Sequence, residues 1–275
     1  MTGPFQIVRK TVFFYRENFL DCLLFGFLSQ MVSIVGMMLS PHSRLSALPN
    51  LSSEWLSENV GQVVTLGMTW IFWAVLNLWL YLLIAAAIAK LVWKRTKNEE
   101  AQVVSASLSA FEQGGPLLWA NMLTAFIIGS AAFCASILFL LQRAAANTPG
   151  GGLILSLLLL ACMSGVVFLC LKFSLVTPIV LLEGKKGRDA LNRSWFLMTG
   201  RESDAFFLFA FLFAILLLFG VLMGFLRGGE LNTTVNPDAA TFSMIENIIG
   251  IVIAPLFPIG ITYFYQDIVA HEKKF

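Results

Sequence analysis

The chain has 275 residues, of which 58% are hydrophobic and only 12% are charged. Soluble domains are nearer half apolar and a quarter charged, so a water-soluble fold of this length could not cover its apolar surface. The net charge of +2 comes without a basic run interleaved with aromatic residues, which excludes a nucleic-acid-binding surface.

Six apolar segments are long enough to cross a bilayer as helices, which takes about 20 residues each. The sequence predicts them at 19–39, 63–92, 117–141, 153–182, 205–226 and 245–268. Because lipid offers the backbone no hydrogen-bond partner, we expect each to be a helix and the chain to be an all-α integral membrane protein. The second and fourth segments exceed the thickness of the bilayer and are expected to tilt, kink or protrude.

The basic residues fall almost entirely on one side of this arrangement. All but three of the 18 Lys and Arg residues lie on the side of the termini, the exceptions being Arg44, Arg143 and Arg227. Since cytoplasmic loops carry the excess of Lys and Arg, both termini are predicted to be cytoplasmic. The chain is thus predicted to be one multi-pass membrane domain, 1–275, with its outer loops near 41–61, 142–152 and 227–243.

Three amphipathic stretches each precede a pair of predicted spans. Apolar residues recur at helical spacing within 8–19, 104–111 and 190–198, and basic residues lie on the other faces of the first and third stretches. This pattern predicts cytoplasmic helices that lie in the headgroup layer. The segments 5–95, 101–183 and 187–275 are then predicted to be three helix-hairpin repeats.

Lys172 is the most informative polar residue in a predicted span, because an ionisable side chain is costly at membrane depth. We expect its ammonium to extend toward the interface, with a lipid phosphate or Asp267 as alternative partners. Pro178, Pro255 and Pro258 are expected to kink their helices, because proline lacks a backbone N–H donor. Broken helices also form binding sites in transporters, which is the alternative interpretation of these prolines.

No catalytic, metal or cofactor site is predicted. The four cysteines lie in apolar runs without the spacing of a metal site. The sequence holds only two histidines, and it has no phosphate-binding glycine loop and no nucleophile elbow. We therefore expect a protein that is not an enzyme and that needs neither a metal nor a cofactor.

A recognisable motif follows the fourth predicted span. Residues 183–201 read EGKKGRDALNRSWFLMTGR, and residues 262–268 read TYFYQDI. The first segment resembles the E-G-x-x-x-x-x-A-L-x-R-S-W-x-L-x-x-G pattern of YciC-like bacterial six-span inner-membrane proteins, a family related to the membrane domain of glycerophosphoryl diester phosphodiesterases. The second is similar to the closing Y-x-D pattern of that family. The resemblance implies a multi-pass protein of the bacterial inner membrane with a role in envelope homeostasis, and it implies no phosphodiesterase activity.

Within this motif, Arg188, Arg193 and Trp195 are candidates for contact with lipid headgroups. Guanidinium groups suit anionic phosphates, and tryptophan suits the depth of the headgroup layer. Together with Lys172 they form the predicted lipid-headgroup site, while an anchor that only fixes topology is the alternative. Three functions are open from the sequence. They are binding or transport of membrane lipids or amphiphiles, small-solute transport as a transporter or permease-like subunit, and structural or assembly partnership in a membrane complex.

Overall fold

The computed structural model describes residues 3–39, 60–100, 102–144, 151–228 and 248–272. Nearly all of these residues are helical and none of them forms a strand, which confirms the predicted all-α fold class. Most of each predicted outer loop lies outside the described residues, as do residues 245–247 of the last predicted span.

The helices follow the predicted order of short and long segments. In chain order they are α1 (Pro4–Glu17), α2 (Phe19–Leu39), α5 (Val60–Thr96), α6 (Val103–Glu112), α7 (Gly114–Ala144), α8 (Gly151–Lys172), α9 (Val176–Glu183), α10 (Gly187–Met198), α11 (Glu202–Gly228) and α13 (Leu256–Glu272). A helical stretch at 248–253 precedes α13.

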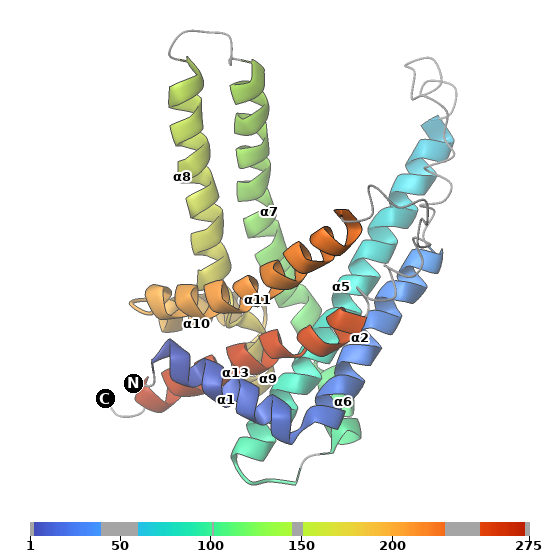
Figure 1. Ribbon diagram of the computed structural model, residues 1–275, viewed down its shortest axis with the longest axis vertical. Helices are drawn as coiled ribbons and strands as arrows, with labels where there is room; N and C mark the ends of the chain where they lie inside the picture. The colour runs from blue at the N-terminus through green and yellow to red at the C-terminus, as the bar shows by residue number, and fades with distance from the viewer. Residues whose placement is uncertain (1–2, 40–59, 101, 145–150, 229–247, 273–275) are drawn as a thin grey trace.

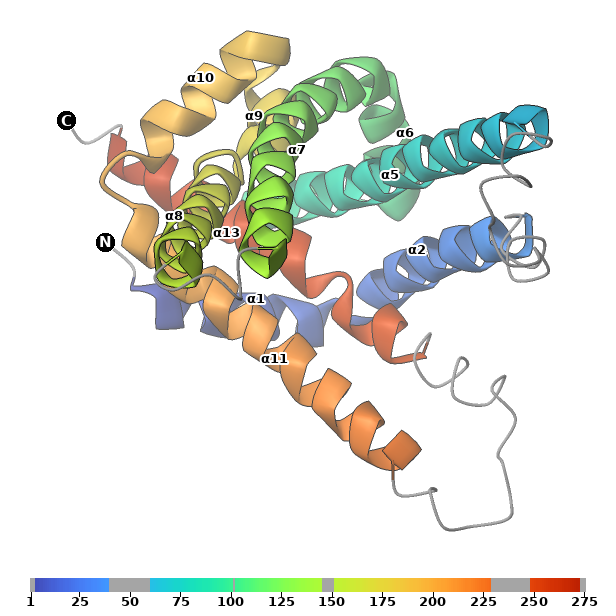
Figure 2. The same cartoon turned by 90° about the horizontal axis from the view of Figure 1, so that it is seen from above.

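Short helices form a base layer, and the long apolar helices extend from it (Figure 1). In this layer α1 packs on α13 and α11, α10 packs on α7 and α9, and α6 packs on α5. The buried apolar side chains of the base form one cluster, to which α5, α9 and α13 all contribute. The α7–α8 hairpin, the α2–α5 pair and α11 diverge from this base, as the view from above shows (Figure 2).

The long helices carry the surface that a bilayer requires. Among the described residues, four segments are long and apolar enough to cross a membrane, namely Val75–Thr96, Gly114–Gln142, Ile154–Glu183 and Ile248–Glu272. Their outward side chains are large and apolar, as shown by Phe126 at 77% exposed and Phe133 at 67% exposed. In water this surface would aggregate, so the chain is built for a hydrocarbon environment.

The α2 helix approaches the stretch 248–253 closely. A side chain at Gly26 would collide with the backbone carbonyl oxygen of Ile251, and one at Gly250 would collide with the side chain of Gln30. Gly26 therefore lets the two backbones come within a distance that a larger residue at this position does not permit, as in other closely packed membrane helices, whereas the Gln30 side chain can move away from position 250.

Glycines in the left-handed conformation set the direction of the helices around the motif. Gly184 (φ 69°) and Gly187 (φ 49°) turn the chain between α9 and α10, and Gly200 (φ 79°) lies in the turn from α10 to α11. This region of φ is readily accessible to glycine but strained for other residues. The motif glycines thus bring α10 back against α9 and the lower part of α8.

Candidate functional site

Two of the long apolar segments are broken at a similar point. Residues 173–175 separate α8 from α9, and Pro178 lies in the first turn of α9. Residues 254–255 separate the stretch 248–253 from α13; Pro255 is part of that break and Pro258 lies in the first turn of α13. Each break falls in the turn that precedes a proline, where a continuous helix would lose a hydrogen bond and clash with the ring.

Lys172 is the last residue of α8 and lies at the first of these breaks. Its side chain is only 3% exposed, and its Nζ lies 2.7 Å from Oε1 of Glu202 at the start of α11. The ammonium also donates to Oγ1 of Thr199 at 3.1 Å. The backbone carbonyl of Lys172 accepts a hydrogen bond from Oγ of the buried Ser194 at 2.7 Å. A single residue therefore connects α8 with α10 and α11.

Aromatic rings cover the remaining side of this ammonium. The Nζ of Lys172 lies 5.0 Å from the ring centroid of Trp195 and 5.3 Å from that of Phe168. The two rings contact each other edge to face, with their centroids 5.9 Å apart. Ring faces attract a cation and exclude water from it, so they stabilise a charge that is buried beside one carboxylate.

The carboxylate next to Lys172 was not among the partners predicted from the sequence. The ion pair that Lys172 makes is with Glu202, whereas the predicted carboxylate was Asp267; contact with a lipid phosphate stays a prediction. The physical reason is the turn at 199–201, which returns the chain to the end of α8 and supplies a carboxylate and a hydroxyl there. Opposite charges at this distance attract each other strongly where water is largely excluded.

Arg193 lies in a second charged cluster, which joins the two sequence motifs. Its Nε donates to both carboxylate oxygens of Glu183 at 3.2 Å, and its Nη1 and Nη2 bind Glu272 at 2.7 and 2.5 Å. The hydroxyl of the buried Tyr265 donates to Oε1 of Glu183 at 2.8 Å. The hydrogen bond to Glu272 raises the pKa of Arg193, so this guanidinium is charged at every accessible pH. This cluster holds α9, α10 and α13 together.

The four predicted headgroup residues are therefore divided among three places. Lys172 and Trp195 are in contact, while the guanidinium of Arg193 is engaged by two carboxylates that a phosphate would have to displace. Arg188 is exposed on α10 and has no ion pair within the part of the chain that the structure describes. Sequence reasoning missed Glu183, Glu202 and Glu272, because each reaches its partner across a turn or from a distant helix.

An apolar groove lies between α8 and α11, next to Lys172. It has a volume of about 420 Å³, and every side chain in its wall is aliphatic, aromatic or a cysteine. The residues that line it are Val166, Val167, Cys170, Leu171, Phe206, Phe209, Ala210, Phe213 and Phe257. The wall includes Leu171, the chain neighbour of Lys172, and Phe206, which lies one helical turn after Glu202.

A metal centre has no support in this part of the molecule. Among the described residues, no group of three or more His, Cys, Asp or Glu side chains is placed to hold a metal ion.

No family model, no curated protein and no solved structure matches the chain. The resemblance to the YciC-like family therefore stays a prediction from the two motifs.

The Lys172–Glu202 pair predicts a specific dependence of stability on pH. The hydrogen bond from Lys172 lowers the pKa of Glu202 below its usual value of about 4.3. A lowered folded-state pKa gives stability that is complete above the unfolded-state value and is lost as the pH falls through the folded-state value. We expect the unfolding midpoint to fall more steeply below about pH 5 in the wild type than in Glu202→Gln. Detergent-solubilised protein titrated from pH 6 to about pH 3 checks this, and parallel curves would contradict it.

Proposed function

We propose that the chain is a multi-pass protein of the bacterial inner membrane with six spans and cytoplasmic termini. In this topology α1, α6 and α10 are the cytoplasmic helices of three hairpin units. The packing supports such units, because each short helix contacts the second long helix of the unit before it. Thus α6 packs on α5, α10 packs on α9, and α1 closes the ring by packing on α13. The excess of Lys and Arg around the same helices supports the cytoplasmic assignment.

The function we propose is binding of membrane lipids or similar amphiphiles, without catalysis. The observation that carries it is the groove between α8 and α11, which is apolar throughout and lies between the two helices that the Lys172–Glu202 ion pair joins. A ligand with a hydrocarbon chain and a polar head matches an apolar groove that lies beside charged residues. The hydrocarbon chain of the ligand would lie along Phe206, Phe209 and Phe213. Its polar head would lie at the turn formed by 199–201.

The charges at that turn favour an anionic head. Glu202 already balances Lys172, and Arg201, which precedes Glu202 in the chain, adds a further positive charge. Arg188 is exposed in the first turn of α10, at the other end of this helix, and adds a positive charge to the same layer. Basic residues in the cytoplasmic headgroup layer attract anionic lipid, at about 1 kcal/mol for each Lys or Arg near the surface.

Native mass spectrometry of protein extracted with its membrane lipids tests this function. Ala210 lines the groove, and Ala210→Trp would fill it with a large ring. We expect a lipid of one class to stay bound to the wild type and to be lost from Ala210→Trp. The matched control is Ala161→Trp, which places the same ring at an exposed position of α8 outside the groove wall.

The charge contribution is tested with Arg188→Ala and Arg201→Ala in the same experiment. We expect both variants to retain lipid but to lose the preference for anionic over zwitterionic headgroups. Equal lipid retention in Ala210→Trp and Ala161→Trp would contradict the groove as the binding site. Loss of all lipid from both tryptophan variants would instead indicate a general disturbance of the fold, which circular dichroism would detect.

Small-solute transport is the second candidate, favoured by one observation. Two proline-broken helices meet at a single pocket, as they do in transporters that bind solutes at discontinuous helices. Proteoliposomes loaded with a solute panel test it, and absence of flux across the panel would count against it. No observation among the described residues favours a role as an assembly partner.

A further inference from the structure

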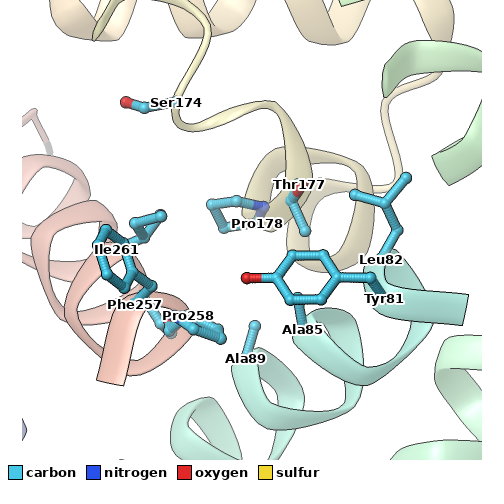
Figure 3. Close-up of a pocket in the computed structure, with 11 residues that line it drawn as sticks. Tyr81, Leu82, Ala85, Ala89, Ser174, Thr177, Pro178, Phe257, Pro258 and Ile261 are labelled. Atoms are coloured by element: carbon cyan, nitrogen blue, oxygen red, sulfur yellow. The ribbon is translucent and has the colours of Figure 1, made fainter. Parts of the chain in front are cut away.

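A small pocket lies at the centre of the base, where α5, α9 and α13 meet. Its volume is about 160 Å³, and both proline breaks contribute to its wall through Ser174, Pro178 and Pro258 (Figure 3). The second long helix of each proposed hairpin unit therefore supplies one side of the pocket. Phe257 lines both this pocket and the α8–α11 groove.

The polar part of the wall holds the hydroxyl groups of Tyr81, Ser174, Thr177 and Thr262. The hydroxyl of Ser174 donates to the carbonyl of Leu171 at 2.8 Å, and the hydroxyl of Thr262 donates to the carbonyl of Pro258 at 2.6 Å. Both hydroxyl oxygens keep lone pairs once their protons are used. In addition, Pro178 has no N–H, so the carbonyl of Ser174 lacks the donor that an unbroken helix would supply.

Tyr81 adds to the pocket a hydroxyl group that can donate or accept a hydrogen bond. It comes from α5, and Figure 3 shows its hydroxyl between Pro178 on one side and Pro258 on the other. A phenol can donate to a ligand oxygen or accept from a ligand donor. The aliphatic part of the wall, which includes Leu82, Ala85 and Ala89, faces the same space.

The wall excludes a charged ligand. None of the described residues that line the pocket is acidic, basic or a histidine. An ion would therefore lose its hydration without gaining a counter-charge, which costs far more than the loss of hydration by a neutral group. A space of this size holds one small ring, since an apolar cavity of about 150 Å³ accommodates benzene.

We propose that this pocket is a binding site for a neutral, ring-sized amphiphile that carries a hydroxyl donor, in the class of phenols and small alcohols. The apolar body of the ligand lies against Leu82, Ala85 and Ala89. Its hydroxyl pairs with the hydroxyl of Tyr81. This site is independent of lipid binding in the α8–α11 groove, because it requires neither Lys172 nor Ala210.

Fluorine NMR of the full-length protein in mild detergent tests the site with para-fluorophenol and fluorobenzene. The two probes have similar volume, and only the first has a hydroxyl donor. We expect para-fluorophenol to bind saturably and about tenfold more tightly than fluorobenzene, the effect of one satisfied hydrogen bond. Tyr81→Phe preserves the ring and removes the hydroxyl, so it is expected to reduce that preference severalfold.

Filling the pocket supplies the second measurement. Ala85→Phe is expected to abolish saturable para-fluorophenol binding, whereas Ala161→Phe on α8 is expected to leave it unchanged. Ala210→Trp should also leave it unchanged, which separates this site from the lipid groove. Equal affinity for the two probes in the wild type would overturn the proposal. Binding that persists unchanged in both Tyr81→Phe and folded Ala85→Phe would overturn it as well.

Discussion

Replacing Glu202 by alanine is expected to lower the free energy of unfolding by about 3 kcal/mol. The substitution leaves Lys172 charged at a position where its side chain is only 3% exposed, with the Thr199 hydroxyl and two rings as its remaining neighbours. Removal of one partner from a buried ion pair typically costs about 3–5 kcal/mol, and the partial exposure of Glu202 places this pair at the low end. Equilibrium unfolding in mixed micelles with increasing SDS measures the change.

The double variant Lys172→Met/Glu202→Ala is the control that identifies the cause. Methionine keeps the apolar stem of the lysine and removes the charge, so the double variant is expected to regain most of the stability lost in Glu202→Ala. Lys172→Met alone should be the milder single substitution, because Glu202 is 31% exposed and can be hydrated. If the effects of the two single substitutions simply add in the double variant, the pair is not coupled and the argument fails.

Gly26→Ala is expected to destabilise the protein by about 2 kcal/mol, although it adds only one methyl group. That methyl would collide with the backbone carbonyl oxygen of Ile251, and a backbone atom cannot rotate away as a flexible side chain can. The α2 helix would have to move away from the stretch 248–253, and the contact between Gly250 and Gln30 would open with it. The same unfolding assay measures the loss.

Gly129→Ala and Gly165→Ala are the matched controls for this effect. Both residues lie inside long helices, on α7 and α8, and a methyl group at either would meet nothing within 4 Å. Alanine has the higher helix propensity by up to about 1 kcal/mol, so these variants are expected to be neutral or slightly stabilised. A loss of stability in the controls equal to that in Gly26→Ala would show that helix packing at Gly26 is not the cause.

The positions of the helices could be predicted well from the sequence, because long apolar runs have few ways to satisfy their backbone in lipid. The predicted segment 117–141 lies within α7, and 205–226 lies within α11. The predicted segment 153–182 proved to be two helices, α8 and α9, with a turn before Pro178. A proline in an apolar run allows either a kink or a complete break, and surrounding packing decides between them.

The faces of the short helices were harder to predict. In the apolar stripe predicted for α10, Ala190, Leu191, Ser194 and Met198 are buried, whereas Trp195 is 42% exposed. In α6, however, Val104 and Leu108 are 68% and 63% exposed, and Ala106 and Ala110 form the buried face. A helix in the headgroup layer has two apolar environments, protein on one side and lipid on the other. Helical spacing alone identifies apolar faces but does not distinguish which of them contacts protein.

The candidate site was only partly accessible from the sequence. Lys172 could be singled out because a charge within an apolar run requires an explanation. Its partner could not be found, since Glu202 becomes adjacent only through the left-handed turn at Gly200. The same holds for Arg193, whose two carboxylates come from the end of α9 and from the last turn of α13. Pairings that depend on tertiary contacts leave no periodic signal.

The packing of α1 against α13 has a consequence for biosynthesis. The α1 helix contacts α11 and α13, and the ring centroids of Phe14 and Tyr263 are 6.0 Å apart. Until α13 has been synthesised, the face of α1 formed by Ile7, Thr11 and Phe14 lacks its partner from that helix. Its opposite apolar residues, including Phe5 and Phe13, can hold it on the membrane surface during this interval. The ribosome thus synthesises α1 before α13, the helix on which α1 packs in the folded base.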